Sequence, residues 1–428
     1  MIDRRQARLE LAQGRGRLPS VVGAVFDRYG VVWAGRAGGG ADLNAQYRIG
    51  SITKTMTAVL VMQARDAGLV DLDDPVGRHL GDIGYAECTL RQLLSHTSGM
   101  QSEPTGPWWE RTRGSDFAAL AAANDGSGRV AAAGEWFHYS NLGFALLGEV
   151  VARVTGSPWR QLVTQSLLLP LGMTQTSYLP RPGAQPGFSV GHFTGVPQLE
   201  PLADTGAMAP AGQLWSTLAD LVLWGQLLAG ARPDLLAPES LAEMTSPVTA
   251  DYGLGLRLTT GTTGTLVGHT GSMPGFLAAV LVDPASGIGG VTLMNATTGV
   301  DQEVLLLELI DGDLDHDGVE PWVPSGELPE AIRGVPGLWF WGNTATEVRW
   351  HNRRLELRQL AVPDEIELFG LGDGRIVGLQ GYHRGETLHV VRRPDGEVDH
   401  LEVATFVLTR TPYDPAAPIP GGPPRQRA

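Results

Sequence analysis

Two kinds of hydrophobic pattern alternate along the first 300 residues of the chain. Apolar runs over residues 21–26 and 31–34, separated by the polar turn 27–30, predict a β-hairpin. After it, apolar residues recur at helical spacing from Ser51 up to Gly68, namely at Ile52, Met56, Val59 and Leu60. The pattern predicts a helix that begins at Ser51 and ends at Gly68.

The middle of the chain has helical patterns, and strand patterns return after it. Residues 71–241 are mostly helical in pattern, and the clearest helices are predicted over Leu142–Val154 and Thr217–Leu228. Strands are predicted at 255–258, 265–269, 276–282 and 290–295. Because strands stand at both ends of this segment, we expect a non-sequential antiparallel sheet with inserted helices, an α/β fold.

The last third of the chain has a different character. Residues 311–330 are acidic and predict a linker. Asp313, Asp315, Asp317 and Gly318 match the first half of a calcium loop, but Pro324 stands where the bidentate Glu is needed, which favours a solvated linker. Short alternating strands with turns at 351–352, 372–374 and 394–396 predict a small antiparallel β-barrel over 331–415. The Pro- and Gly-rich tail 416–428 is expected to be disordered. The predicted catalytic domain is therefore 1–310.

Composition excludes several classes of function. A net charge of -14 argues against nucleic acid or an anionic membrane as partner. The single cysteine, Cys88, allows no internal disulfide. No run approaches the roughly 18 apolar residues of a membrane span. Spacings typical of metal ligands or of a nucleotide-binding loop are missing, so we expect no metal and no cofactor. If Met1 is the natural start, the charged N-terminus without an apolar leader predicts a cytoplasmic protein.

Lys54 is the only lysine among 32 basic residues. It could be a survivor of codon usage that favours arginine, or it could be needed because arginine cannot lose its proton whereas a desolvated lysine can. Ser51 and Lys54 lie on the same face of the predicted helix. The positive end of the helix dipole favours negative charge on Ser51, so a neutral Lys54 could take its proton.

The spacing S-x-x-K alone is a weak signal, since an N-cap serine followed by a surface lysine looks the same. Two further stretches strengthen it: Tyr139-Ser140-Asn141 before a predicted helix, and His269-Thr270-Gly271 at the end of a predicted strand. In this order the motifs resemble S-x-x-K, S-D-N and K-T-G. Over residues 18–300 the chain resembles the penicillin-recognising serine hydrolases, which include class C β-lactamases, penicillin-binding proteins, D-aminopeptidases and family VIII esterases.

The resemblance implies roles for individual residues. Ser51 would be the nucleophile, Lys54 its base, and Tyr139 a general acid or base. Asn141 would orient Lys54 and bind a substrate amide. The backbone N–H groups of Ser51 and Ser272 would form the oxyanion hole, and Thr270 and Gly271 would line the substrate site. A non-catalytic binding protein with this fold would be expected to have lost Ser, Lys or Tyr, and all three are present.

His269 stands where the family pattern has lysine. A histidine with a pKa of about 6.5 is mostly neutral at pH 7, so carboxylate-bearing lactams should bind less well. The resemblance therefore implies an acyl-serine enzyme that cleaves esters or D-residue amides, ahead of a β-lactamase or DD-peptidase. Its substrate would be a small molecule or a peptide. The oligomeric state is left open.

The H-T-G motif and the following barrel also resemble the penicillin-binding-protein-type thioesterases. These enzymes carry a lipocalin-like C-terminal domain and release nonribosomal peptides as macrocycles, so the alternative substrate is a peptidyl thioester derived from a carrier protein. Arg410, at the end of the last predicted strand, resembles that group as well. It could clamp a substrate carboxylate, or it could form a salt bridge that joins the barrel to the catalytic domain.

Overall fold

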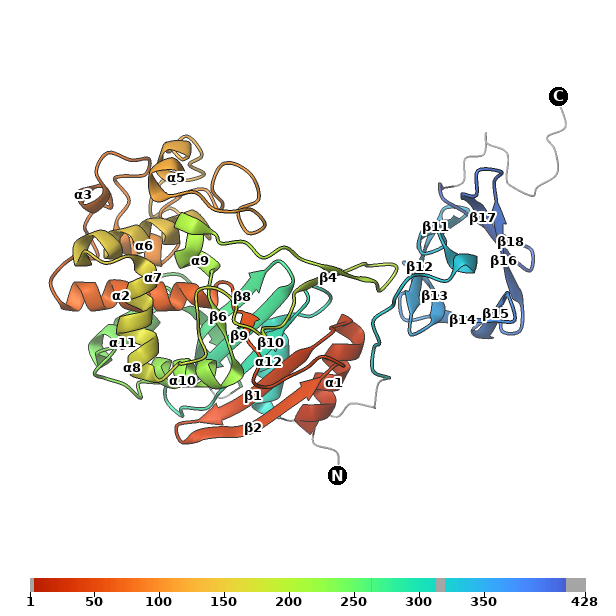
Figure 1. The fold of residues 1–428 in the computed structure, drawn as a ribbon, viewed down its shortest axis with the longest axis horizontal. Coiled ribbons are helices and arrows are strands. Elements are labelled where there is room, and N and C mark those ends of the chain that lie inside the picture. The colour runs from red at the N-terminus through yellow and green to blue at the C-terminus, as the bar shows by residue number, and fades with distance from the viewer. Residues whose placement is uncertain (1–3, 263, 313–319, 413–428) are drawn as a thin grey trace. The chain divides into compact units, whose positions relative to one another are not determined.

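The structure, a computed structural model, describes residues 4–262, 264–312 and 320–412. The chain divides into two compact units (Figure 1). The first consists of Met1–Ser189 and Leu199–Pro321, and the second of Val190–Gln198 and the chain from Trp322 onward. The residues that match half of a calcium loop, 313–318, and the predicted disordered tail, 416–428, lie outside the described residues.

Among the described residues, the first unit is built on six antiparallel strands in the order β2-β1-β10-β9-β8-β7 (Figure 1). Their bounds are β1 Val21–Asp27, β2 Gly30–Ala37, β7 Arg257–Thr260, β8 Thr265–Met273, β9 Phe276–Val282 and β10 Gly289–Met294. β1 pairs with β10, with Val21 opposite Met294. The two ends of the segment therefore meet within one sheet, which confirms the predicted hairpin and the non-sequential α/β fold.

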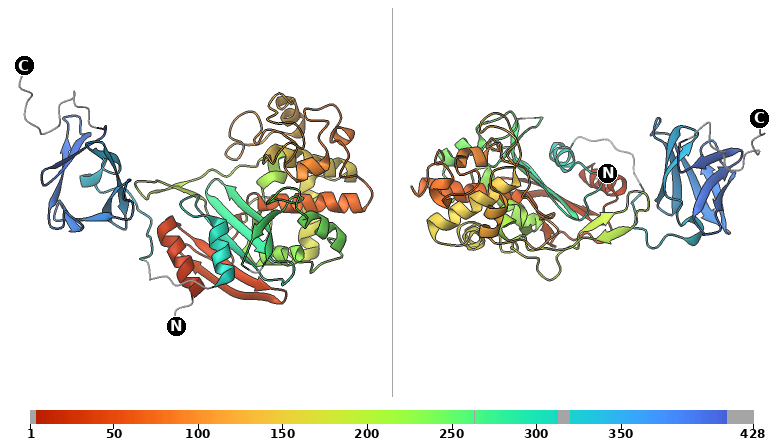
Figure 2. Two further views of the ribbon diagram at one scale, coloured as in Figure 1. Left: turned by 180° about the vertical axis from the view of Figure 1, so that it is seen from behind. Right: turned by 90° about the horizontal axis from the view of Figure 1, so that it is seen from above.

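Helices cover both faces of this sheet (Figure 2). α1 (Arg4–Gly16) and α12 (Gln302–Asp311) contact each other and β1 on one side. On the other side, α10 (Leu218–Leu228) packs on β1, β9 and β10, and α2 (Ile52–Asp66) packs on β8 and β9. No helix in the described ranges is both long and apolar enough to span a membrane.

The remaining elements of the first unit are short, apart from α6. The helices are α3 Gly77–Leu80, α4 Leu90–Leu94, α5 Phe117–Ala123, α6 Asn141–Thr155, α7 Trp159–Leu162, α8 Leu169–Leu171, α9 Ala209–Gly212 and α11 Pro238–Thr245, with a π-helical turn Val163–Leu168 between α7 and α8 and a 3₁₀ turn Gly206–Met208 before α9. The small strands are β3 Tyr47–Arg48, β4 Phe188–Val190, β5 Pro197–Leu199 and β6 Trp215–Ser216. α2, α6 and α10 confirm the helices predicted from Ser51, Leu142 and Thr217.

Two helices, α1 and α12, were not predicted. The apolar residues of α1 are interrupted by charges, which weakens the helical pattern. α12 contains signals that the sequence reading passed over. Asp301 caps it by accepting from the N–H groups of Glu303 and Val304, and Gly312 ends it in the left-handed conformation.

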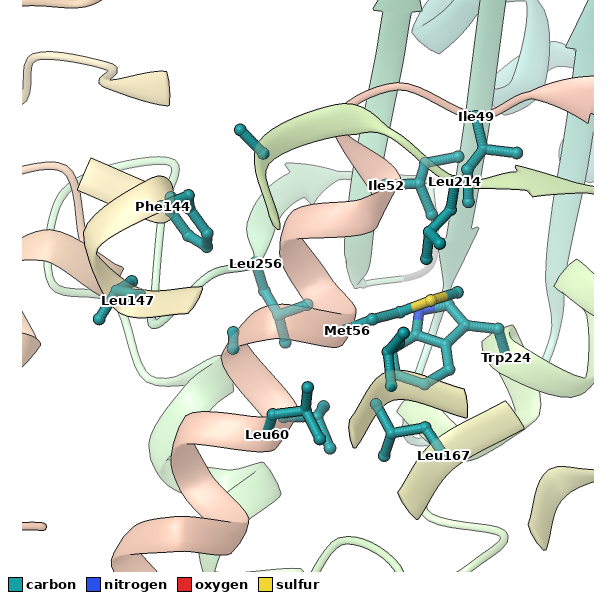
Figure 3. Packing of buried hydrophobic residues seen from close by; sticks show 14 of the residues in the cluster. Ile49, Ile52, Met56, Leu60, Phe144, Leu147, Leu167, Leu214, Trp224 and Leu256 are labelled. Atoms are coloured by element: carbon teal, nitrogen blue, oxygen red, sulfur yellow. The ribbon is translucent and has the colours of Figure 1, made fainter. Parts of the chain in front are cut away.

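α2 runs through the interior of the first unit and is buried on nearly every side (Figure 3). Ile52, Met56 and Leu60 pack against the core that includes Trp224. The threonine hydroxyls of α2 form hydrogen bonds within the helix or to residues across the core. For example, Trp224 Nε1 donates to Thr55 Oγ1 at 2.8 Å. A helix surrounded by other elements leaves its polar side chains in a desolvated environment, and Lys54 is one of them.

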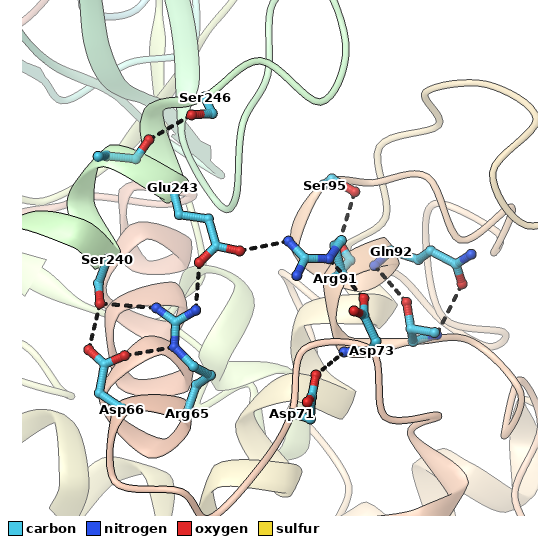
Figure 4. Close-up of polar contacts among 12 residues, drawn as sticks. Arg65, Asp66, Asp71, Asp73, Arg91, Gln92, Ser95, Ser240, Glu243 and Ser246 are labelled. Atoms are coloured by element: carbon cyan, nitrogen blue, oxygen red, sulfur yellow. Dashed lines mark hydrogen bonds and ion pairs between the residues drawn. The ribbon is translucent and has the colours of Figure 1, made fainter.

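A polar network holds the C-terminal end of α2 (Figure 4). Arg65 contacts Ser240 and Glu243 of α11, and Arg91 of α4 donates to the other oxygen of Glu243 at 2.8 Å. Arg91 also reaches Asp73 at 2.9 Å. Because several charges share these contacts, the network fixes α2 relative to α4 and α11 better than one exposed ion pair would.

Eight strands of the described C-terminal part form a closed antiparallel barrel, which confirms the predicted all-β module. Neighbouring strands in the barrel are consecutive in sequence, from β11 to β18. The barrel closes where β11 pairs with β18, with Phe340 opposite Thr409. The bounds are β11 Gly337–Trp341, β12 Thr344–His351, β13 Arg354–Gln359, β14 Ile366–Gly372, β15 Arg375–Gln380, β16 Thr387–Arg392, β17 Val398–Val403 and β18 Phe406–Thr409, preceded by a 3₁₀ turn Glu330–Ile332.

The second unit also takes in a segment from the middle of the chain. Val190–Gln198, which runs from the last residue of β4 into β5, belongs to it by its contacts. The Trp350 N–H donates to the Phe193 carbonyl at 2.7 Å, and the Ser325 N–H donates to the Gly195 carbonyl at 3.3 Å. The barrel unit therefore combines residues that are far apart in sequence.

Candidate active site

Ser51 immediately precedes α2. The backbone just before it, at Ile49 and Gly50, lies against the backbone of β8 at Gly271 and Ser272. Gly50 has a φ of 52°, and a Cβ there would lie 2.6 Å from the Ser272 nitrogen. A Cβ on Gly271 would lie 2.0 Å from the Ile49 carbonyl oxygen. Only glycine at both positions permits this close approach. The predicted oxyanion donors, the N–H groups of Ser51 and Ser272, thus belong to two backbones in direct contact.

Lys54 lies one turn into α2 and is fully buried. Its Nζ is 2.9 Å from Ser51 Oγ and donates to the Ala211 carbonyl at 2.7 Å. Burial lowers the pKa of Lys54 to about 7, although the negative charges of Glu103 and Glu110 act to raise it. A substantial share of this amine is therefore neutral at pH 7 and able to accept a proton.

Tyr139 reaches the same serine from the start of α6. Burial raises the pKa of its hydroxyl above the usual range for tyrosine, and a hydrogen bond with Ser51 acts to lower it. The Lys54 ammonium lies 5.0 Å from the centre of the Tyr139 ring. The ring of His96 packs beside it with the centroids 4.2 Å apart, and His96 Nδ1 accepts from the Ser140 N–H at 3.0 Å. Tyr139 is therefore a protonated phenol at neutral pH.

Asn141 is nearly buried, and its amide has a partner that sequence reasoning missed. The side-chain nitrogen donates to Glu103 Oε1 at 2.7 Å, while Trp109 Nε1 donates to Glu103 Oε2 at 2.6 Å. Glu103 is also the first of the charges that raise the pKa of Lys54. Asn141 thus contacts a carboxylate that acts on Lys54. Glu103 lies in a loop outside every motif, so the sequence offered no signal for it.

His269 lies on β8 and is buried. Its Nδ1 faces the Thr270 carbonyl, which can only accept, so the proton lies on Nδ1 and Nε2 accepts from the Tyr252 hydroxyl at 3.0 Å. Burial, followed by the positive charge of Lys54, lowers the pKa of His269 to about 3. The imidazole is therefore neutral at pH 7, as expected from the sequence, and both its nitrogens are already engaged.

A cavity of about 490 Å³ opens beside the predicted nucleophile. Ser51, Tyr139, His269, Thr270 and Ser272 all line it, so the structure brings these five predicted residues together. Gly271 is not among the residues that line the cavity; it lies against the backbone at Ile49.

Arg257, at the start of β7, also lines this cavity and was not predicted. On β7, the edge strand beside β8, it pairs with Gly268, the residue before His269, so the strand register places it at the cavity. Its guanidinium forms an ion pair with Glu303 at 2.9 Å. The cavity therefore holds an arginine whose charge is balanced by a neighbouring carboxylate.

Arg410 makes its described contacts within the barrel. Its guanidinium lies 3.7 Å from the centre of the Trp339 ring and donates to the carbonyls of Leu338, at 3.0 Å, and Gly334. These contacts tie the end of β18 to the start of β11. Neither proposed role for Arg410, the substrate clamp or the inter-domain salt bridge, is tested by them, and both stay predictions.

Comparison with known proteins is consistent with this geometry. A family model described as Beta-lactamase matches residues 5–312, and one described as a domain of unknown function, DUF7586, matches residues 328–410. Penicillin-binding protein 4 of Amycolatopsis lactamdurans is 29% identical over 58% of this chain and 72% of its own length. The D-alanyl-D-alanine-carboxypeptidase/endopeptidase AmpH of Escherichia coli K12 is 32% identical over 43% of this chain and 49% of its own length. The chain spans about half the length of AmpH and of several other curated relatives that it matches.

Solved structures are similar too. A D-stereospecific amidohydrolase from Streptomyces sp. is 28% identical, with a TM-score of 0.63 over 73% of this chain and 99% of its own. SurE is 25% identical, with a TM-score of 0.60 over 96% of this chain and 99% of its own. The family match covers most of the chain and includes the whole constellation around Ser51. This chain belongs to the beta-lactamase family of serine hydrolases.

Proposed function

We propose that this protein is an acyl-serine hydrolase that cleaves amides, peptides or esters of D-residues through an acyl-enzyme on Ser51. The observation that carries the proposal is the contact between Ser51 Oγ and Lys54 Nζ, a buried amine with a pKa of about 7. Three similar proteins support D-residues as substrates: the D-stereospecific amidohydrolase, the D-alanyl-D-alanine carboxypeptidase AmpH, and SurE, which has been solved with D-Leu.

The proposed reaction uses the two proton carriers in turn. Neutral Lys54 takes the hydroxyl proton of Ser51 while Oγ attacks the substrate carbonyl. The N–H groups of Ser51 and Ser272 stabilise the resulting oxyanion, each contributing about 3–4 kcal/mol to the transition state. When the bond to the leaving group breaks, Tyr139 donates its proton to that group. The proton that Lys54 took from Ser51 then passes to Tyr139 and restores the phenol, and water hydrolyses the acyl-enzyme, giving its hydroxyl to the acyl group and a proton to Ser51.

The charges around the cavity favour a neutral leaving group. His269 is neutral, and the charge of Arg257 is balanced by Glu303 at 2.9 Å. A leaving group that carries a carboxylate would compete with Glu303 for the guanidinium. Simple D-amino-acid amides and esters avoid this competition, and this favours them over β-lactams and D-alanyl-D-alanine peptides in the proposal.

Matched D- and L-phenylalaninamide, assayed with wild type and Ser51→Ala, test the proposal. We expect release of ammonia from the D-amide, loss of this activity in Ser51→Ala, and an acyl mass on the Ser51 peptide after rapid quenching. A fluorophosphonate that leaves folded wild-type protein unlabelled would overturn the acyl-serine mechanism. Faster turnover of the L-amide would overturn only the stereochemical preference.

Transfer of the acyl group to an amine is the second candidate. It is favoured by the closed barrel after the catalytic domain, the arrangement expected of penicillin-binding-protein-type thioesterases. A linear peptidyl thioester with a free N-terminus and a C-terminal D-residue distinguishes the two reactions. A product one water lighter than the free acid indicates macrocyclisation, whereas free acid alone indicates hydrolysis.

A further inference from the structure

The C-terminal barrel contains a cavity of about 700 Å³, larger than the one beside Ser51. It reaches inward-facing side chains of several strands, including Leu357, Val403 and Leu408. Cavities of this size accommodate small organic molecules. A barrel that needed only to be stable would fill this volume with side chains, so the space indicates a binding function separate from the acyl-serine chemistry.

Aromatic rings form one wall of this barrel cavity. The Phe406 ring is the centre of the group, with centroids 5.1 Å from Trp341, 6.0 Å from Tyr382 and 5.1 Å from His383. The neighbours meet it edge to face, at interplanar angles of 62°, 87° and 83°. Tyr382 is 81% exposed although it is a large ring. Exposed aromatic faces attract apolar groups and, through their quadrupoles, organic cations.

Two carboxylates line the barrel cavity. Among the described residues that line it, Glu365 and Glu367 are the only Asp, Glu, Lys or Arg side chains. Glu367 Oε2 is held in place because it accepts from His383 Nδ1 at 2.8 Å and from the His383 N–H at 3.2 Å. An occupant with a carboxylate would be repelled, whereas a cation would find two carboxylates beside an aromatic wall.

We propose that the barrel cavity binds a small ammonium compound with an apolar body, such as an arylalkyl amine. The ammonium group lies near Glu365 and Glu367, and the apolar body packs on the ring cluster around Phe406. The inference rests on the barrel alone and does not depend on the function proposed for Ser51.

Three probes of matched size test this on the full chain: 2-phenylethylamine, 2-phenylethanol and 3-phenylpropanoate, titrated by calorimetry at neutral pH. We expect the amine to bind at least about tenfold more tightly than the alcohol, because the cation gains both the carboxylates and the ring faces. The acid should bind most weakly. Protein whose Ser51 has been blocked with a fluorophosphonate should bind the amine equally well, which places the binding outside the Ser51 cavity.

The informative variant is the isosteric pair Glu365→Gln with Glu367→Gln. It should bring the ratio of amine to alcohol affinity close to one, while Glu397→Gln, an exposed glutamate outside the barrel cavity, leaves the ratio as in wild type. Tyr382→Ala removes a ring that is already exposed, so it should fold normally and bind the amine several-fold more weakly. Equal binding of amine and alcohol by wild type, tighter binding of the acid, no detectable binding of the amine, or an unchanged ratio in the folded double variant would each overturn the proposal.

Discussion

Lys54 Nζ lies 2.9 Å from Ser51 Oγ, and the same serine hydroxyl is hydrogen-bonded to Tyr139. One oxygen is thus held between an amine with a pKa of about 7 and a phenol with a raised pKa. Because the pKa of Lys54 is lowered and that of Tyr139 is raised, Lys54 is suited to accept a proton and Tyr139 to donate one. The acid and base roles proposed above follow from this separation.

Lys54→Arg should lower kcat/KM by about 10²- to 10⁴-fold, because arginine keeps its proton and cannot serve as a base. The far-ultraviolet circular dichroism spectrum shows whether the variant folds, and steady-state kinetics with a D-amino-acid amide give the loss. If folded Lys54→Arg keeps wild-type activity, the lone lysine reflects codon usage and not catalysis.

The activity should depend on pH through Lys54. Because the neutral amine is the active form, kcat/KM for an uncharged ester should rise with pH through about 7 and then level off. His269, with a pKa of about 3, stays neutral across this range, and Tyr139 stays protonated. A pH–rate profile with an uncharged substrate tests this; a rate that decreases as pH rises through 7 would contradict the assignment of Lys54 as the base.

Lys54→Met should stabilise the fold, since it removes a buried amine. The folded state lowers the pKa of Lys54 from its ordinary value of about 10.4 to about 7, so the unfolded chain binds more protons between these values and wild-type stability rises with pH across that window. The variant should therefore be more stable than wild type by about 1–4 kcal/mol below pH 7, with the difference shrinking toward pH 10. Urea unfolding at both ends of the window measures it, and a constant difference would show that Lys54 does not titrate in the folded protein.

Tyr139→Phe should affect amides more than activated esters. An amide leaving group must be protonated as it departs, whereas a nitrophenolate leaves without help. We expect kcat for D-phenylalaninamide to fall by about 10²- to 10⁴-fold and kcat for a nitrophenyl ester of the same acyl group to fall much less. Equal losses on both substrates would assign Tyr139 to positioning Ser51 instead of to proton donation.

Glu303→Gln should change the choice of leaving group. Removing the carboxylate frees Arg257, so KM for a substrate that ends in D-alanyl-D-alanine should fall by about two- to fivefold relative to KM for the matching amide. Glu239→Gln, an exposed glutamate on α11, is the control and should leave the ratio unchanged. A ratio that stays constant in Glu303→Gln would show that Arg257 does not meet the leaving group.

Much of this arrangement could be predicted because it depends on local pattern. The helix from Ser51, the strand that carries His269 and the alternating strands of the barrel all have periodicities that the sequence displays directly. The order of the three motifs identified the family. His269 was expected to be neutral from its ordinary pKa alone.

Other features depend on tertiary contacts that no short pattern records. Glu103 meets Asn141 only because the loop between α4 and α5 reaches the start of α6, and Arg257 meets the cavity only through the register of β7 with β8. The lowered pKa of Lys54 results from the burial of α2 by elements that are distant in sequence. The barrel cavity likewise depends on which side chains face the interior, and this requires the register of all its strands.

The contribution of Val190–Gln198 to the second unit has a consequence for biosynthesis. During translation this segment leaves the ribosome long before Trp350, whose N–H pairs with the Phe193 carbonyl. Until the barrel strands are made, the segment has no partner among them and presents open backbone groups on the nascent chain. The second unit can therefore be completed only after the barrel strands have been synthesised, and a message truncated before the barrel would yield a polypeptide with an unprotected loop that chaperones and proteases can recognise.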